Sequence, residues 1–168
     1  MQRSANARWS GDLKSGKGSI RLGSGAFEGP YSFISRFEGS GDTNPEELLG
    51  AAHAACFSMA LSLALSLAGH PPASVTTTAT VTLDKVGAGF GITGIALSTR
   101  GVVPGVSAAE FQRLAEETKV GCFISKALSA VPMVLDAQLL PGGAPACRAA
   151  RCPASGSGSG SPPRRCSS

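Results

Sequence analysis

The stretch NPEELLGAAHAACFSMALSLALSLAG, residues 44–69, decides the fold of this chain. Asn44 or the preceding Thr43 can cap a helix, and Pro45 suits the first helical position. Gly69, closely followed by two prolines, marks the end of the helix. We expect a helix of about 24 residues and roughly 36 Å. Because almost every face is apolar, the helix should lie inside the domain and pack on several sides.

Residues 48–67 are also long enough to cross a membrane, since they carry no formal charge unless His53 is protonated. Against a membrane span, the segment is rich in Ala, Ser and Gly and lacks aromatic or basic flanks. The polar N-terminus lacks the apolar core of a secretory signal. We therefore predict a buried central helix in a cytoplasmic protein that makes no membrane contact.

Shorter periodic segments lie on both sides of this helix. Upstream, residues 5–40 contain short extended runs joined by glycine-rich turns, and the alternation at 32–37 predicts a half-buried strand. Downstream, the predicted elements are a β-hairpin of residues 75–83 and 92–103, helices at 107–119 and 122–130, and a last strand at 131–140. These elements form one domain, residues 1–140.

The last segment, residues 141–168, differs from the rest in composition. It is more than half Gly, Ser and Pro and has no apolar periodicity, so we expect it to be a disordered tail. The net charge of +4 comes from four arginines in this tail, because residues 1–140 carry eleven Lys and Arg against eleven Asp and Glu. The domain therefore offers no basic field for nucleic acid.

The five cysteines divide between the tail and the domain. Cys147, Cys152 and Cys166 lie in the tail without CxxC spacing, so we expect no metal site there. Cys122 opens the predicted helix at 122–130, where unpaired backbone N–H groups lower the pKa of a thiol. Cys122 is therefore a candidate reactive thiol.

Cys56 lies in the middle of the long helix and gains nothing from a helix end. It is either a small residue at a close helix contact or a reactive thiol that needs a cationic neighbour. The candidate cation is Arg36 on the predicted strand at 32–37, with Glu46 or Glu47 to orient the guanidinium. His53, on the same helix face as Cys56, is either a satisfied core residue or part of a Cys–His pair.

Three segments of the chain resemble a known family. RFEGSGDTNPEELLGAAHAACFSMALS at 36–62, VTLDKVGAGFGIT at 81–93 and VGCFISKAL at 120–128 are similar to the OsmC branch of the OsmC/Ohr family. These are osmotically induced or hydroperoxide-resistance proteins of bacteria. The resemblance covers about residues 6–140, in order and with family-like spacing, and it leaves out the tail.

The resemblance implies a fold and an activity. The fold is α+β, with two strongly curved antiparallel sheets around two central helices, and two chains interlock as a homodimer with each active site at the subunit interface. The implied activity is a thiol-dependent peroxidase that acts on organic hydroperoxides and less well on hydrogen peroxide. It needs no cofactor or metal, and an external dithiol supplies the electrons.

The resemblance also implies roles for individual residues. Cys56 becomes the peroxidatic thiol that is oxidised to sulfenic acid, and Cys122 becomes the resolving thiol that forms a disulfide with it. Arg36 stabilises the thiolate and polarises the peroxide, with Glu46 or Glu47 as its partner. The family usually has proline after the second cysteine, where this chain has Phe123, and this difference bears on the local geometry of Cys122.

Two other functions fit the same residues. Oxidation of Cys56 can change a surface and so serve a redox-sensing or binding protein without efficient turnover. Alternatively, the chain forms a structural dimer whose catalytic residues have decayed. Steady peroxide consumption that is lost in Cys56→Ser distinguishes an enzyme from both.

Overall fold

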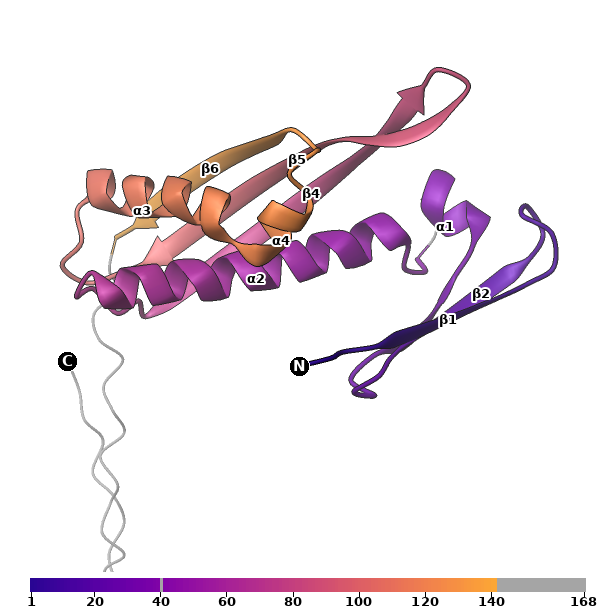
Figure 1. Ribbon diagram of the computed structural model, residues 1–168, viewed down its shortest axis with the longest axis horizontal. Coiled ribbons are helices and arrows are strands. Elements are labelled where there is room, and N and C mark those ends of the chain that lie inside the picture. The colour runs from indigo at the N-terminus through magenta and orange to yellow at the C-terminus, as the bar shows by residue number, and fades with distance from the viewer. Residues whose placement is uncertain (40, 142–168) are drawn as a thin grey trace, which may run out of the picture.

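Helix α2 (Pro45–Leu67) runs through the middle of the computed structural model, which describes residues 1–39 and 41–141 (Figure 1). The Asn44 side chain caps the helix by accepting a 2.8 Å hydrogen bond from the Glu47 amide. Gly69, just beyond the helix, has a φ of 86°, which favours glycine. The long central helix is therefore confirmed with the ends that its capping residues predict.

One face of α2 packs on a sheet of three strands. The sheet consists of β4 (Ser74–Val86), β5 (Gly89–Val102) and β6 (Met133–Leu140), with β5 in the centre. The antiparallel β4–β5 hairpin is long and curved (Figure 1). The hydrophobic core lies between this sheet and the helices, and its largest buried apolar side chains are Phe57, Leu61, Leu65, Ile95, Leu97 and Phe111.

The expectation of two purely antiparallel sheets is wrong for the last strand. β6 pairs with β5 in parallel, from Ile95 opposite Met133 to Val102 opposite Leu140. The reason lies in the connection between them, which contains α3 (Ala108–Gly121) and α4 (Phe123–Ala127). A crossover of that length returns the chain to the starting end of β5, and this is the arrangement that parallel pairing needs.

The N-terminal sheet is separate from the first and lies beyond one end of α2 (Figure 1). It is an antiparallel meander of β1 (Ala5–Ser10), β2 (Lys17–Leu22) and β3 (Glu28–Tyr31). The two sheets and the helices of this chain confirm the α+β class of the fold.

The strand predicted at 32–37 is wrong, because these residues form the short helix α1 (Phe33–Phe37). The Ser32 hydroxyl accepts from the Ser35 amide at 3.0 Å, and the Ser35 hydroxyl accepts from the Ser32 amide at 2.9 Å. This reciprocal capping box starts a helix, and it outweighs the alternation of apolar residues. Arg36 therefore lies on a helix.

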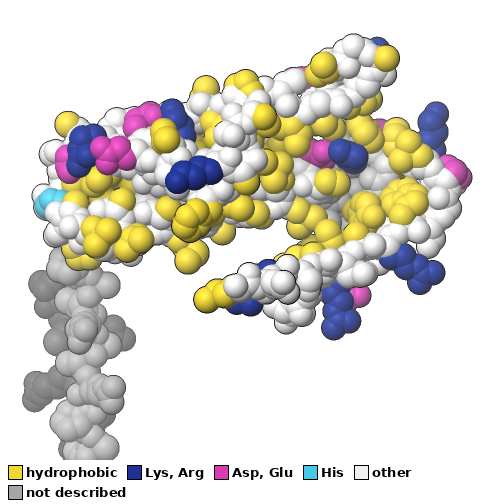
Figure 2. All heavy atoms as spheres, in the orientation of Figure 1, with side chains coloured by type: hydrophobic (Ala, Val, Ile, Leu, Met, Phe, Trp, Pro, Cys, Tyr) yellow, Lys and Arg dark blue, Asp and Glu magenta, His cyan; other side chains and the backbone are white. Residues whose placement is uncertain are grey.

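The prediction that α2 packs on several sides is wrong for a single chain. Phe57, Leu61 and Leu65 are fully buried, whereas the opposite side exposes Met59, Leu63 and Leu67 by 75%, 62% and 79%. Figure 2 shows hydrophobic side chains along this edge of the molecule. By length and composition α2 could cross a membrane. In one chain only the face of α2 toward the sheet is buried, so the prediction of a helix inside the domain holds for that face alone.

The predicted tail and its three cysteines lie outside the described residues, apart from Pro141.

Gly50 lies where α2 closely approaches β4, and this contact yields a stability prediction. A Cβ at Gly50 would lie 2.8 Å from the carbonyl oxygen of Ala79 on β4. We expect Gly50→Ala to lower the free energy of unfolding by about 1 kcal/mol or more, because the crowding exceeds the gain in helix propensity. Thermal melting measures this. Gly121→Ala is the matched control, since a Cβ there meets nothing within 4 Å. Equal melting temperatures for the two variants would contradict the packing.

Candidate thiol site

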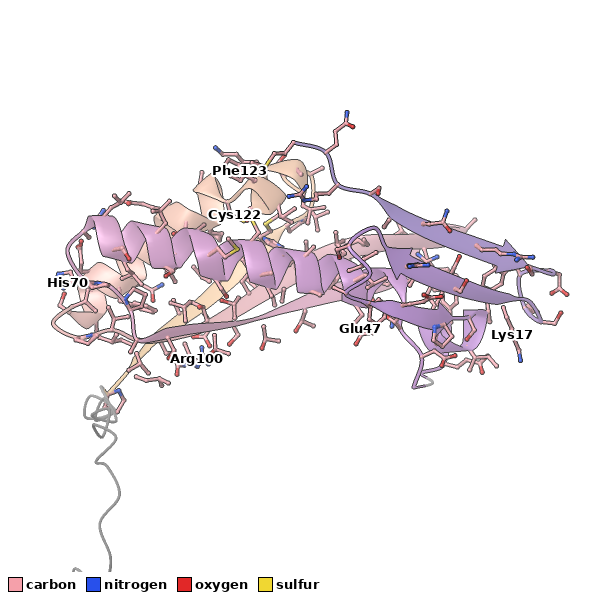
Figure 3. The ribbon with its side chains drawn as sticks, turned by 90° about the horizontal axis from the view of Figure 1, so that it is seen from below. Lys17, Glu47, His70, Arg100, Cys122 and Phe123 are labelled. Atoms are coloured by element: carbon pink, nitrogen blue, oxygen red, sulfur yellow. The ribbon has the colours of Figure 1, made fainter. Side chains whose placement is uncertain are left out.

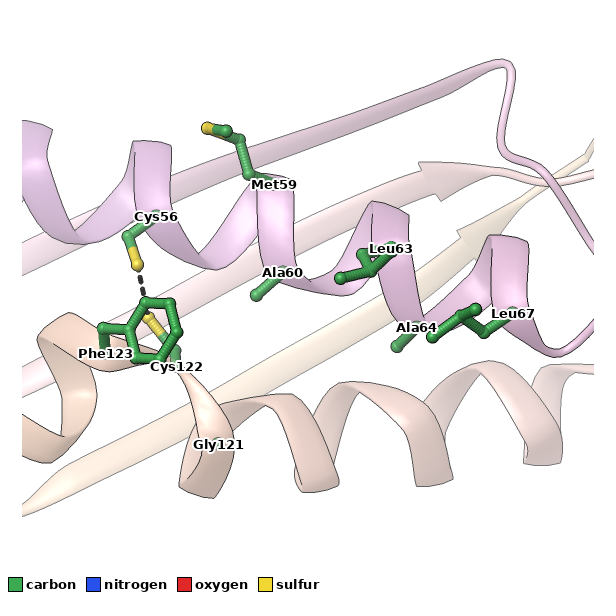
Figure 4. Close-up of a pocket in the computed structure, with 9 residues that line it drawn as sticks. All are labelled: Cys56, Met59, Ala60, Leu63, Ala64, Leu67, Gly121, Cys122 and Phe123. Carbon is green, nitrogen blue, oxygen red and sulfur yellow. Dashed lines mark hydrogen bonds between the residues drawn. The ribbon is translucent and has the colours of Figure 1, made fainter.

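Cys56 and Cys122 lie side by side, although 66 residues separate them in the sequence. The two thiols are within hydrogen-bond distance, with 3.1 Å between their Sγ atoms (Figure 4). Both thiols are free. Figure 3 shows Cys122 beside the middle of α2, and Cys56 lies on that part of the helix. Since a disulfide has an S–S distance of about 2.0 Å, a small movement would suffice to form one.

A break between two helices holds Cys122 in place. Its amide donates to the Thr118 carbonyl at 2.8 Å and ends α3, and its extended ψ of 134° turns the chain into α4. Phe123 then occupies the first position of α4. A phenylalanine in place of the family's proline therefore still allows a helix to start directly after the cysteine. Cys122 itself is only 2% exposed.

The two thiols differ in acidity. Burial raises the pKa of Cys56, and the hydrogen bond with Cys122 raises it further. Burial also raises the pKa of Cys122, but contacts with the Ser125 amide, with Cys56 and with the Ser125 hydroxyl outweigh burial, and the net direction is downward. Within one chain, the groups around the two sulfurs therefore favour the Cys122 thiolate and disfavour the Cys56 thiolate.

An apolar groove of about 520 Å³ begins at the two sulfurs. It follows α2 for about three turns, and Figure 4 shows its lining side chains in a row along that helix. Apart from the cysteines and Gly121, the lining residues are Met59, Ala60, Leu63, Ala64, Leu67 and Phe123. The groove can therefore hold a hydrocarbon chain with one end at the sulfur atoms.

Arg36 and Glu46 form an ion pair at the other end of α2. The Arg36 Nη2 lies 2.6 Å from Glu46 Oε1, and its Nε contacts both carboxylate oxygens at 3.2 Å. Glu47 instead accepts from the Thr43 hydroxyl at 2.9 Å. Of the two glutamates that the sequence offered, Glu46 is therefore the partner of Arg36.

The guanidinium does not reach the thiols within one chain. Glu46 precedes Cys56 by ten residues on a continuous helix, which corresponds to about 15 Å. Arg36 lines a different groove, between α1 and the N-terminal sheet, together with Trp9 and Tyr31. The five predicted site residues are thus divided. The two cysteines meet and Arg36 pairs with Glu46, whereas Glu47 forms no ion pair with another described residue.

His53 and Ser125 form a buried contact that sequence reasoning missed. The Nε2 of His53 lies 2.8 Å from the Ser125 hydroxyl oxygen, and both side chains are buried. His53 therefore contacts Ser125 and makes no direct hydrogen bond with Cys56. A sequence signal existed, since each residue lies three positions from one of the cysteines.

Among residues 1–39 and 41–141, no three His, Cys, Asp or Glu side chains cluster closely enough to hold a metal ion.

The chain is similar to one known protein family, to a curated relative and to solved structures. The family of OsmC-like proteins matches residues 38–136. The chain is 52% identical over 140 residues to Peroxiredoxin OsmC of Escherichia coli K12, covering 83% of this chain and 97% of that protein. A solved organic hydroperoxide resistance protein from Elizabethkingia anophelis has a TM-score of 0.67 at 26% identity, covering 83% and 99%. OhrB of Bacillus subtilis shares the fold, with a TM-score of 0.65 at 24% identity, covering 80% and 98%.

The acidity of the two thiols yields a prediction about their coupling. Cys122→Ala removes the neighbouring thiolate, so we expect the pKa of Cys56 to fall. Cys56→Ala removes a hydrogen bond that favours the Cys122 thiolate, so we expect the pKa of Cys122 to rise. Thiolate absorbance at 240 nm, followed against pH in the reduced variants, measures both. Two pKa values that are independent of the neighbour would show that the sulfurs do not interact in solution.

Proposed function

The chain belongs to the OsmC family, and we propose that it is a peroxidase that uses Cys56 and Cys122 to reduce organic hydroperoxides, and hydrogen peroxide more weakly. The observation that carries the proposal is the pair of free thiols 3.1 Å apart at the end of an apolar groove. One sulfur can be oxidised there and the other can reach it without a large movement of the backbone.

The first step oxidises Cys56. Its thiolate attacks the distal oxygen of the hydroperoxide, a sulfur–oxygen bond forms, and the O–O bond breaks. The leaving alkoxide takes up a proton and departs as an alcohol. The Cys56 sulfur has then lost two electrons to the peroxide and is a sulfenic acid.

The second step forms the disulfide. The Cys122 thiolate attacks the Cys56 sulfur, an S–S bond forms, and hydroxide leaves and is protonated to water. An external dithiol then reduces the disulfide by two exchange reactions and is itself oxidised. This restores both thiols and completes the cycle without a cofactor.

The groove favours apolar substrates. Burying a methylene group contributes about 0.8 kcal/mol, so alkyl and lipid hydroperoxides gain binding free energy along α2 that hydrogen peroxide does not. The lining is almost entirely aliphatic or aromatic, with Met59 and Leu63 at its exposed edge and Phe123 beside the sulfurs. We infer a preference for larger hydroperoxides from this lining.

A second copy of the chain completes the site in this proposal. The exposed apolar side chains of α2 adjoin the groove and need a covering surface. Cys56 also needs a cation, because burial raises its pKa, and Glu46, which binds the Arg36 of the same chain, lies about 15 Å before Cys56 along α2. We propose a homodimer in which Arg36 of one copy, held by Glu46, approaches Cys56 of the other. The proposed location is the cytoplasm.

Oxidation by one equivalent of cumene hydroperoxide tests the thiol chemistry. We expect the intact mass to fall by two hydrogens, with the disulfide mapped to a Cys56–Cys122 peptide. With dithiothreitol present, we expect steady peroxide consumption that Cys56→Ser abolishes. A single oxidation with no turnover would instead indicate a redox sensor. Unchanged thiols after exposure to the peroxide would contradict the proposal.

Mixed dimers test the origin of the cation. Cys56→Ser and Arg36→Ala chains should each be inactive alone, but their co-expressed mixture should regain about a quarter of the wild-type activity, because half the dimers contain one complete site. Arg100→Ala is the matched control, since Arg100 pairs with Asp136 at the surface and should not affect activity. A mixture without activity would show that each Arg36 serves its own chain.

A further inference from the structure

The buried His53 has no role in the proposed reaction steps of Cys56 and Cys122. His53 is 0% exposed and lies among the core residues of α2. Its Nε2 contacts the Ser125 hydroxyl, while its Nδ1 has no hydrogen-bond partner within the described part of the chain. A buried polar atom without a partner costs stability, so a purely structural histidine is a poor choice at this position.

Ser125 connects this histidine to the thiols. Cys122 is the N-cap of α4, and Ser125 occupies the third position of that helix with its side chain buried. Because Ser125 follows the N-cap residue by three positions, its amide and hydroxyl lie on the Cys122 side of the helix end, and both lower the pKa of that thiol. Ser125 therefore lies between two hydrogen-bonded pairs, His53 with Ser125 and Cys122 with Cys56.

The direction of the donors follows from the burial of His53. Burial lowers the pKa of His53, so the ring is neutral at neutral pH and carries one proton. With that proton on Nε2, the ring donates to the Ser125 oxygen, and the Ser125 hydroxyl is left to donate to the Cys122 sulfur. The alternative tautomer would bury an unpaired N–H and turn the hydroxyl toward the ring. Orphaned buried N–H groups are rarer than orphaned acceptors, which favours the first arrangement.

We propose that His53 and Ser125 prepare Cys122 for disulfide formation: His53 fixes the orientation of the Ser125 hydroxyl, and this hydroxyl stabilises the Cys122 thiolate that attacks the oxidised Cys56 sulfur. In this proposal Ser125 donates to a reacting atom and is a catalytic residue, whereas His53 acts through it and is a positioning residue. The proposal rests on the proposed peroxidase cycle. When the disulfide forms, Cys122 has released one proton, and the hydroxide that leaves the Cys56 sulfur takes up one proton to become water.

A single-turnover experiment tests this role. Reduced protein is mixed with one equivalent of cumene hydroperoxide, and disulfide formation is followed by quenching and intact mass at several pH values. We expect Ser125→Ala to slow disulfide formation about ten- to a hundredfold, the effect of one hydrogen bond to a charged group. Sulfenic acid at Cys56 should accumulate and be trapped by dimedone. The pH midpoint of the step should move upward.

Two substitutions of His53 separate positioning from packing. His53→Gln keeps an N–H near the place of Nε2, so it should retain most of the wild-type rate of disulfide formation. His53→Leu removes the donor and should slow the step as Ser125→Ala does. Circular dichroism and thermal melting check that each variant is folded. If both Ser125→Ala and folded His53→Leu form the disulfide at the wild-type rate and pH midpoint, the proposal is wrong.

A titration that needs no peroxide keeps this inference separate from the peroxidase cycle. In the Cys56→Ala background, thiolate absorbance at 240 nm reports Cys122 within the described domain, and Cys122→Ala in the same background corrects for the other thiols. Adding Ser125→Ala should raise the pKa of Cys122, and adding His53→Gln should not. A shift without any peroxidase activity would support the inference and reject the cycle. An unchanged pKa with normal turnover would do the reverse.

Discussion

The packing of α2 on the β4–β5–β6 sheet sets the position of every group at the site. Phe57, Leu61 and Leu65 are fully buried there, and burial of side chains of this size contributes about 1.5–3 kcal/mol each. This contact fixes the rotation of the helix. Because successive residues turn by about 100°, Cys56 then points to the break between α3 and α4, and Met59 points away from the sheet. His53, one turn before Phe57, is carried into the core.

The acidity of the thiols is the reason for the proposal that a second copy of the chain completes the site. Cys122 is more deeply buried than Cys56, yet it receives the donors that offset burial. Cys56 faces burial and a neighbouring thiol without a comparable donor side chain of its own. The amides of Ile124 and Phe123 offset only part of this rise, so the proposed peroxidatic role of Cys56 gains from a positive charge supplied by a second copy. The Arg36–Glu46 pair is a pre-formed charge of that kind, since the carboxylate holds the guanidinium in one orientation.

Preferences that act over a few neighbouring residues predict some elements of the fold correctly and fail for others. Asn44, Pro45 and Gly69 define α2 because capping and turn preferences act over a few residues. The helix α1 was missed because two serine hydroxyls compete with the alternating pattern. Sequence alone also cannot show the parallel pairing of β6 or the contact between His53 and Ser125, since residues 72 apart meet only after the sheet and helices have assembled.

The polar contacts beside the sulfurs also distinguish a reactive site from a merely buried one. A cysteine that only fills space needs apolar neighbours, and a buried serine–histidine pair beside it would add desolvation cost with one ring nitrogen left unpaired. Beside a thiolate the same pair is stabilising, because each donor that is already oriented toward a buried anion lowers its free energy. The polar groups next to Cys122 are therefore better explained by the ionised sulfur than by the thiol, and the same preference links the fold of α4 to its chemistry.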